Sequence, residues 1–386
     1  MKVKFDPSIV PEDSLLHLWL EARQILETPY SYDLAIAMSV IGACLKRTCW
    51  IDQKRFRVYP NMSTLLVGHS GIGKDTAIDG GEEILQAVDI IPVIGGRTSE
   101  TISEKLLALG DPAAAVILAG ELSEFFGPKD YQKGMMETIT DLMSTKAYKD
   151  ISLKSQKDQP RRIMRPTLTM LGGSTRDWLH SAMPEHAMSG GFYPRFLIVC
   201  EDEVKRQVPW VKYSLPPEEI NQADDAQEGF IIGLREIMSR FSNIGEVVPR
   251  DGGKEAYEKF YAEREQYFST AAAPYAHRCR DTALRVAIIS AVSRFHDYVD
   301  KTDFEFAANL MAYIGARVDE ALAPPTISGR VERDILKLLP TTSSYIYRQL
   351  GQKYEHRFIE QALKSLEFNS LRIKNNGKGI FSVNNV

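Results

Sequence analysis

Paired cysteines are missing from this chain. Its four cysteines, at positions 44, 49, 200 and 279, lie far apart and form no C-x-x-C pair. This spacing argues against a zinc ribbon and against a disulfide framework. Residues 1–7 hold no apolar signal core, and no apolar run approaches the ~18–20 residues that span a bilayer. We therefore expect a protein of the reducing cytoplasm with no membrane partner.

A strong charge of either sign is missing as well, because the net charge is −4 over 386 residues. Any argument for nucleic-acid binding must therefore come from local charge. The length allows roughly two or three domains of ordinary size, and a hydrophobic content of 44% is enough to build their cores. An ordinary globular protein is expected.

The stretch 68–76, Gly-His-Ser-Gly-Ile-Gly-Lys-Asp-Thr, is typical of a phosphate-binding loop. It follows an apolar strand at 64–67 and opens a helix expected over 75–88. Glycines let such a backbone wrap phosphate oxygens, while Lys74 offers its charge to the β- and γ-phosphates at a helix N-terminus. The loop predicts bound ATP. The residues assigned to the nucleotide are Gly68, Gly71, Ile72, Gly73, Lys74, Asp75 and Thr76.

The loop departs from the usual pattern at one position. Asp75 stands where a Mg²⁺-binding Ser or Thr should follow the lysine, and Thr76 comes one place later. A second departure is Gly120. It directly precedes Glu121, the candidate catalytic acid of the next motif, at a position where an aspartate is often found. Our hypothesis joins the two: Asp75 supplies near Mg²⁺ the carboxylate that Gly120 lacks, while Thr76 binds on the α-phosphate side. Asp75 and Thr76 are therefore the candidate metal residues.

Two further apolar runs end in polar residues. The run 113–119 leads to Glu121 and resembles a Walker B strand, whose acid orients and polarises the attacking water. A solvated acid at the end of a core strand is the alternative. The run 166–173 leads to Ser174 and Thr175, of which Ser174 would sense loss of the γ-phosphate. Either residue would also serve as the N-cap of a helix starting at 176.

A fourth apolar strand, 195–200, begins with Arg195. Its guanidinium either stabilises the γ-phosphate at a neighbouring subunit's site, as an arginine finger does, or forms a salt bridge with an acid at the sheet edge. A long amphipathic helix over 276–296 adds Arg278, Arg280 and Arg285 on its early turns. Contact of one of these with a bound nucleotide is one interpretation, and packing and surface pairing account for most such arginines.

The segment 144–162 is basic and expected to be a flexible loop. It carries six Lys or Arg against two Asp, with Tyr148 among them. Such a loop suits the backbone of single-stranded DNA, although charge runs also occur as solvated hairpins. The candidate DNA-binding residues here are Lys146, Lys149, Lys154, Lys157 and Arg161.

The last sixty residues read as a winged helix after a Pro-rich linker at 324–329. Helices are expected over 330–339, 344–351 and 355–368, followed by a hairpin that turns at Asn376-Gly377. From position 330 onward, ten Lys or Arg stand against five acids. This excess favours DNA contact, with protein docking as the alternative. Arg357, Lys364 and Lys374 are the candidate DNA-binding residues of this domain.

These motifs, together with the block Gly191-Phe-Tyr-Pro-Arg-Phe-Leu197, resemble the P-loop replicative helicases of phages, plasmids and mobile elements, which are often fused or partnered to primases. The resemblance covers residues 30–300. It implies an α/β fold with a RecA-like core and a mainly parallel sheet, a hexameric ring and ATP-driven movement on DNA. It also implies the finger role for Arg195. A separate primase is the expected partner, because the first sixty residues leave no room for one.

The expected domains are a helical collar (1–48), the P-loop ATPase core (49–208), a helical subdomain (209–323) with a connector at 209–227, and the winged helix (326–386). The predicted function is an ATP-dependent DNA helicase or translocase. Lys74, Glu121, Arg195 and Ser174 are its catalytic candidates, and ATP and Mg²⁺ are its cofactors. A helicase loader or origin-remodelling switch is the alternative. A nucleotide kinase would leave the basic segment and winged helix without a task.

Overall fold

The computed structural model describes residues 3–89, 98–126, 134–151, 161–182, 191–268, 272–322, 331, 334–335, 338–368, 373–375 and 380–383. The chain forms two compact units, Met1–Ala321 and Leu322–Val386. Within the described ranges, no helix combines the length and apolar character needed to cross a membrane.

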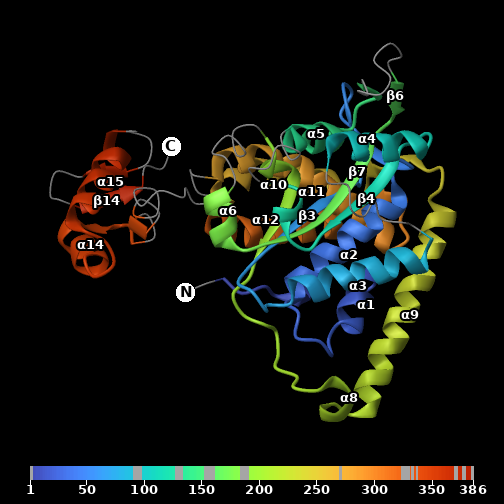
Figure 1. Ribbon diagram of the computed structural model, residues 1–386, viewed down its shortest axis with the longest axis horizontal. Helices are drawn as coiled ribbons and strands as arrows, with labels where there is room; N and C mark the ends of the chain where they lie inside the picture. Colours follow the sequence, from blue (N-terminus) through green and yellow to red (C-terminus); the bar gives the residue numbers. More distant parts are fainter. Residues whose placement is uncertain are drawn as a thin grey trace. The chain divides into compact units, whose positions relative to one another are not determined.

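The core of the first unit is a parallel sheet with the strand order β4-β7-β3-β8 (Figure 1). Most of its side chains are buried, as in a sheet covered on both faces. Because the strands are parallel, their carboxyl ends share one edge. The predicted α/β class with a mainly parallel sheet is confirmed. The strands are β3 (Ser63–Val67), β4 (Ala114–Ala119), β7 (Thr167–Ser174) and β8 (Phe196–Cys200).

The N-terminal helices pack on this sheet. After η1 (Pro7–Ile9), α1 (Leu15–Ala22) contacts α2 (Tyr30–Leu45), and α2 contacts all four strands. Every residue of α2 after Tyr30 is buried, as expected for a helix that is apolar nearly all round. α3 (Lys74–Ala87) follows the phosphate loop and contacts α2 and β7. The N-terminal helices thus lie in the same compact unit as the sheet.

Along the chain, a hairpin lies between β4, the strand that leads to Glu121, and β7. Two residues, Arg165 and Pro166, join β6 to β7, so the hairpin lies at the amino edge of the sheet, and Figure 1 shows it projecting from the unit. The basic segment, expected to be a loop, therefore contains paired strands, and its residues 152–160 lie outside the described ranges. The elements of this region are α4 (Ser99–Ala108), η2 (Leu122–Glu124), α5 (Met135–Leu142), β5 (Tyr148–Ile151), β6 (Arg161–Met164), α6 (Arg176–Ala182) and η5 (Tyr193–Arg195).

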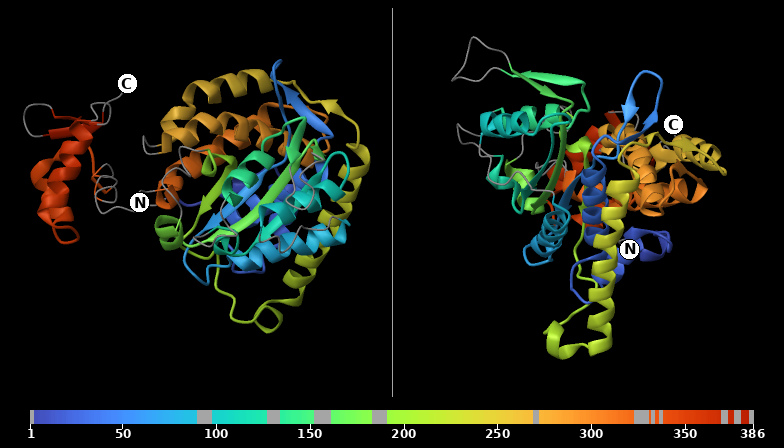
Figure 2. Two further views of the ribbon diagram at one scale, coloured as in Figure 1. Left: turned by 45° about the horizontal axis from the view of Figure 1, so that its top comes forward. Right: turned by 90° about the vertical axis from the view of Figure 1, so that its right-hand side faces the viewer.

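The rest of the first unit is mainly helical. α9 (Pro217–Arg240) corrects the expected connector, because its helix starts ten residues before position 227. Proline at the first helical position and Glu218 and Glu219 in the first turn both favour that start. Figure 2 shows α9 as a long rod with α8 beyond its end. The other helices are α8 (Val211–Ser214), α10 (Gly253–Glu263), η6 (Arg264–Tyr267), α11 (Ala273–Ser293) and α12 (Lys301–Leu322).

Short strands pair at the periphery of this unit. β1 pairs antiparallel with β2 and parallel with β9, and β10 pairs parallel with β11. The bounds are β1 (Cys49–Asp52), β2 (Arg57–Val58), β9 (Gly245–Glu246), β10 (Val248–Pro249) and β11 (Tyr298–Val299).

The second unit pairs helices with a small antiparallel sheet of order β12-β14-β13. Ile346, Ile359 and Leu366 are among the buried side chains of its own apolar core. The two later helices match the expected positions within a residue, while the expected turn at 376–377 lies outside the described residues. The elements are β12 (Thr341–Thr342), α14 (Ser343–Leu350), α15 (His356–Phe368), β13 (Ile373–Asn375) and β14 (Ile380–Val383).

Candidate nucleotide-binding site

Residues 68–73 of the predicted phosphate loop join β3 to the N-terminus of α3. Gly71 and Gly73 have φ angles of 82° and 89°, in the left-handed region that favours glycine. A β-carbon on Gly68 would lie 2.6 Å from the Tyr32 hydroxyl and 2.8 Å from the Glu201 carbonyl oxygen, so that position has room for glycine alone. These backbone features, with a helix N-terminus directly after them, are what an anion-binding loop requires.

Lys74 is the first residue of α3 and is only 5% exposed. Its ammonium donates hydrogen bonds to the carbonyl oxygens of His69 (2.9 Å) and Gly68 (3.3 Å), so its charge is held on the loop. Burial lowers the pKa of Lys74, and the negative charges of Glu121 and Asp75 oppose that change. The three side chains therefore share one electrostatic environment.

Asp75 and Gly120 come from different elements but adjoin each other. Asp75 lies in the first turn of α3, and Gly120 directly follows β4. A β-carbon on Gly120 would lie 3.3 Å from Oδ1 of Asp75. The Asp75 carboxylate thus stands beside the place where the side chain of an aspartate at position 120 would begin.

The chemistry of this corner fits Mg²⁺. The Asp75 and Thr76 side chains are both exposed, and Mg²⁺ is commonly bound through one or two carboxylates, waters and substrate phosphates. Among the described residues, no three His, Cys, Asp or Glu side chains are gathered to hold a metal by themselves. A metal bound by Asp75 would therefore share its ligands with nucleotide phosphates and water.

Glu121 lies one residue beyond Gly120, at the carboxyl edge of the sheet. Partial burial raises the pKa of its carboxyl group, Lys74 lowers it, and the charges of Asp75 and Glu124 raise it further. The side chain stays largely exposed, so solvent reaches it. A carboxylate with a raised pKa beside a phosphate loop has the properties of a general base.

Ser174 and Thr175 make different contacts at the end of β7. Ser174 is fully buried, and its hydroxyl donates a hydrogen bond to the Thr175 carbonyl oxygen (3.2 Å). Its own carbonyl oxygen accepts the Gly68 amide (3.2 Å), which ties the end of β7 to the phosphate loop. Thr175 accepts the Trp178 amide on its hydroxyl (3.2 Å) and so caps α6. The N-cap is therefore Thr175, and Ser174 is the residue beside the loop.

A buried charge network beneath the loop was missed by the sequence analysis. The Asp33 carboxylate is fully buried and accepts hydrogen bonds from Arg23 (3.2 Å), Thr28 (2.6 Å) and Lys205 (2.9 Å). Arg23 also donates to the carbonyl oxygen of Thr76 (2.8 Å), inside the first turn of α3. No local motif marks these residues, because they come from separate segments that only the fold brings together.

Arg195 lies at the opposite edge of the sheet from the phosphate loop. It immediately precedes β8, which is five residues long, so about 16 Å of strand separates it from the carboxyl edge. Its hydrogen bonds to described residues reach neutral oxygens, the Gly191 carbonyl and the Ser144 hydroxyl (3.1 Å). Burial, with Arg278 and Arg285 nearby, lowers the pKa of Arg195 to about 10.

The predicted DNA-binding residues of the segment 144–162 differ in their contacts and in their exposure to solvent. Lys146 and Lys149 both form ion pairs with Asp141, the latter at 2.9 Å. Arg161 is exposed at the start of β6. Arg162, which was not among the candidates, lies over the Tyr148 ring at 3.9 Å and pairs with Asp150. Lys154 and Lys157 lie outside the described residues.

In the second unit, two of the three candidate cations pair with nearby acids, one just before α15 and one within it. Arg357 lies 2.8 Å from Glu355, and Lys364 lies 2.6 Å from Glu360, and all four side chains are exposed. Lys374 is in β13, opposite Ser382 in the strand register, and its side chain is outside the described part. Such exposed pairs are weak and exchange readily with a phosphate backbone.

No known protein-family model matches this chain, and no curated protein is similar to it in sequence. The function therefore has to be inferred from the site itself.

Proposed function

We propose that the first unit is a Mg²⁺-dependent ATPase. The observation that carries this proposal is the convergence of Lys74, Asp75 and Glu121 around the N-terminus of α3, with Ser174 tied to the same loop. The strand order supports it. β3 leads to the phosphate loop, β7 ends at Ser174 and β4 leads to Glu121, and all three strands end at one edge of a parallel sheet.

Each residue then has a chemical task. The loop amides and Lys74 hold the β- and γ-phosphates, and Lys74 exchanges its carbonyl partners for phosphate oxygens. Asp75 would hold Mg²⁺, which when bound neutralises charge on the phosphate oxygens. Glu121 accepts a proton from the attacking water, and Ser174 hydrogen-bonds near the γ-phosphate.

We further propose that the first unit has a RecA-like core and that several copies of the chain assemble into a ring. Arg195 is too far from its own phosphate loop to act there, since it sits at the amino edge of β8. In a head-to-tail ring, two different surfaces of neighbouring copies meet, and we propose that these are the amino edge of one sheet and the carboxyl edge of the next. In that arrangement Arg195 stabilises γ-phosphate charge on a neighbour, and its neutral hydrogen-bond partners leave the guanidinium charge available.

The ring is proposed to be a DNA helicase or translocase of a phage or mobile element, with a separate primase as partner. The β5–β6 hairpin supports this, because it projects from the sheet and presents Tyr148, Arg161 and Arg162 to solvent. An aromatic ring and arginines suit stacking with bases and contact with a DNA backbone. The second unit is proposed to be a winged helix that engages duplex DNA.

One observation favours the alternative of a helicase loader. Asp141 pairs with both Lys146 and Lys149, which reduces the positive charge offered to a DNA strand. A loader would use ATP for assembly rather than unwinding.

The test is to measure ATP hydrolysis and displacement of a forked duplex by the full chain, with Lys74→Ala as the control. A helicase hydrolyses ATP faster on single-stranded DNA and unwinds the fork. Stimulated hydrolysis without unwinding would favour the loader. Hydrolysis that ignores DNA and depends on a nucleoside monophosphate would overturn both.

A further inference from the structure

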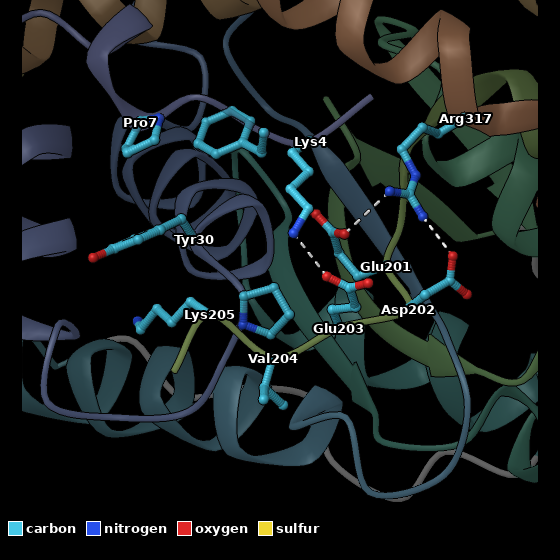
Figure 3. Close-up of a pocket in the computed structure, with 11 residues that line it drawn as sticks. Lys4, Pro7, Tyr30, Glu201, Asp202, Glu203, Val204, Lys205 and Arg317 are labelled. Atoms are coloured by element: carbon cyan, nitrogen blue, oxygen red, sulfur yellow. Dashed lines mark hydrogen bonds and ion pairs between the residues drawn. The ribbon is translucent and has the colours of Figure 1, made fainter. Parts of the chain in front are cut away.

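A cavity of about 260 Å³ lies between the N-terminal segment, the start of α2 and the segment that follows β8 (Figure 3). The lining consists of Lys4, Phe5 and Pro7 of the N-terminal segment, Pro29 and Tyr30 at the start of α2, residues 201–205 after β8, and Arg317 of α12. The volume is close to the lower limit for small-molecule sites. It suits one part of a nucleotide better than a whole nucleoside triphosphate.

The cavity and the phosphate loop share the same supporting backbone. The Glu201 amide donates to the Val67 carbonyl oxygen (3.0 Å), directly before the loop. The His69 ring nitrogen Nε2 lies 3.0 Å from the Asp202 carbonyl oxygen. Thr28, next to Pro29, lies under the loop, since a β-carbon on Gly73 would be 3.0 Å from its methyl group. Segments 28–30 and 201–202 therefore both line the cavity or adjoin it and contact the phosphate loop or the strand that leads into it.

The strand order gives this neighbourhood a direction. Glu121 follows β4, two strands away from β3, whereas residues 201–205 follow β8 on the other side of β3. A nucleotide with its γ-phosphate toward Glu121 therefore extends its other end toward β8. The cavity is on that side.

We propose that this cavity holds the nucleoside of the nucleotide whose phosphates bind the loop, an assignment that rests on the ATPase function proposed above. The N-terminal segment thereby becomes part of the nucleotide site, and so does α12 through Arg317.

The charges of the lining fit an uncharged ligand. Three carboxylates and three cations line the cavity, and Figure 3 shows Lys4 joined to one of the carboxylates and Arg317 joined to the other two. Lys4 binds Glu203 at 2.9 Å, and Arg317 lies 3.4 Å from Glu201 and 2.9 Å from Asp202. A lining without excess positive charge does not attract a further phosphate. Its carboxylates can accept hydrogen bonds from ribose hydroxyls or a base amino group.

The apolar part of the lining fits a flat ring. Phe5, Pro7, Pro29 and Tyr30 contribute ring surfaces, and the Lys205 ammonium lies 4.6 Å from the centre of the Tyr30 ring. Bases of any sequence stack on aromatic side chains. The cavity therefore offers both stacking and hydrogen bonding to a nucleoside.

The test compares two ligands, ATP and inorganic tripolyphosphate, by calorimetric titration in Mg²⁺ buffer. The wild-type protein should bind ATP at least tenfold more tightly than tripolyphosphate. Tyr30→Ala removes a ring, and Val204→Trp fills the cavity. Each should weaken ATP binding at least fivefold and leave tripolyphosphate binding unchanged. Tyr213→Ala, which removes a 69% exposed ring on α8, is the matched control and should bind both ligands as the wild type does.

The outcomes separate this inference from the function on which it rests. Wild-type ATP affinity in both cavity variants, with binding abolished by Lys74→Ala, would overturn the nucleoside site and leave the ATPase standing. Equal loss of ATP and tripolyphosphate binding in the cavity variants would likewise overturn it, because the damage would then be to the loop. Binding of neither ligand by the wild-type protein would overturn both.

Discussion

The Asp75 carboxylate stands beside Gly120, with Oδ1 only 3.3 Å from where a β-carbon on that glycine would lie. The two positions are 45 residues apart in the chain, and each departs from the usual pattern of its motif. Their contact gives both departures one physical explanation, because an aspartate at position 120 would bring a second carboxylate against Asp75. With glycine at position 120, no side chain competes with the Asp75 carboxylate for the place of a magnesium ligand.

Replacing Asp75 by serine should therefore impair Mg²⁺-dependent ATP hydrolysis, by about tenfold or more at limiting Mg²⁺. The serine removes the carboxylate although it restores the residue type common at that position. Hydrolysis measured across a Mg²⁺ titration checks this, and an undiminished rate at limiting Mg²⁺ would sink the hypothesis. The double variant Asp75→Ser/Gly120→Asp should recover part of the lost activity, whereas Gly120→Asp alone should not improve the wild type.

Glu121→Gln should reduce ATP hydrolysis by about 10²–10⁴-fold while ATP binding is kept, because the amide cannot accept the proton of water. Burial raises the pKa of Glu121. As the pH falls through that raised pKa, the carboxylate is protonated and activity should fall, at higher pH than for an ordinary glutamate. Asp75→Ser removes a charge that raises this pKa, so its acid limb should move to lower pH. A pH profile of kcat/KM without this shift would contradict the assignment.

Arg195→Ala and Lys74→Ala should each abolish hydrolysis alone, yet their mixture should regain activity. In a ring, an interface with the intact loop of an Arg195→Ala copy and the intact arginine of a Lys74→Ala copy is complete. Random one-to-one mixing makes roughly a quarter of the interfaces complete. ATPase rates of mixed and unmixed samples decide this. A mixture as inactive as its components would argue against action in trans.

Arg161→Glu should weaken the stimulation of ATP hydrolysis by single-stranded DNA and leave the DNA-free rate unchanged. Its exposed position on the hairpin is remote from the phosphate loop, at the amino edge of the sheet. The salt dependence of DNA binding should also become shallower, because fewer counterions are released. Arg240→Glu, an equally large charge change at an exposed site on α9, is the control. Equal effects of the two changes would remove the hairpin from the DNA path.

Asp33→Ala should lower the free energy of unfolding by about 3–5 kcal/mol, because it leaves Arg23 and Lys205 buried without their carboxylate. Glu305→Ala breaks an exposed pair with Lys301 and should cost less than about 1 kcal/mol. Urea unfolding of both variants gives the comparison. A similar small loss in both would show that the network beneath the loop contributes little to stability.

The sequence by itself determined the local elements. Long apolar runs specified the four strands of the parallel sheet, and glycines before Lys74 specified a turn into a helix, because these signals depend on neighbouring residues alone. The same local reasoning failed at α9. Its first proline and the acids that follow were interpreted as a connector, but they form the start of a helix. This reasoning also failed at the basic segment, whose strands pair with each other.

Only the tertiary structure decided which distant residues meet. Strand order put Glu121 and the 201–205 segment on opposite sides of the loop, and the direction of β8 put Arg195 at the far edge. The contact of Asp75 with Gly120, the burial of Asp33 between Arg23 and Lys205, and the cavity beside Tyr30 all join segments far apart in the chain. Such contacts depend on how helices and strands pack, and no local pattern encodes that packing.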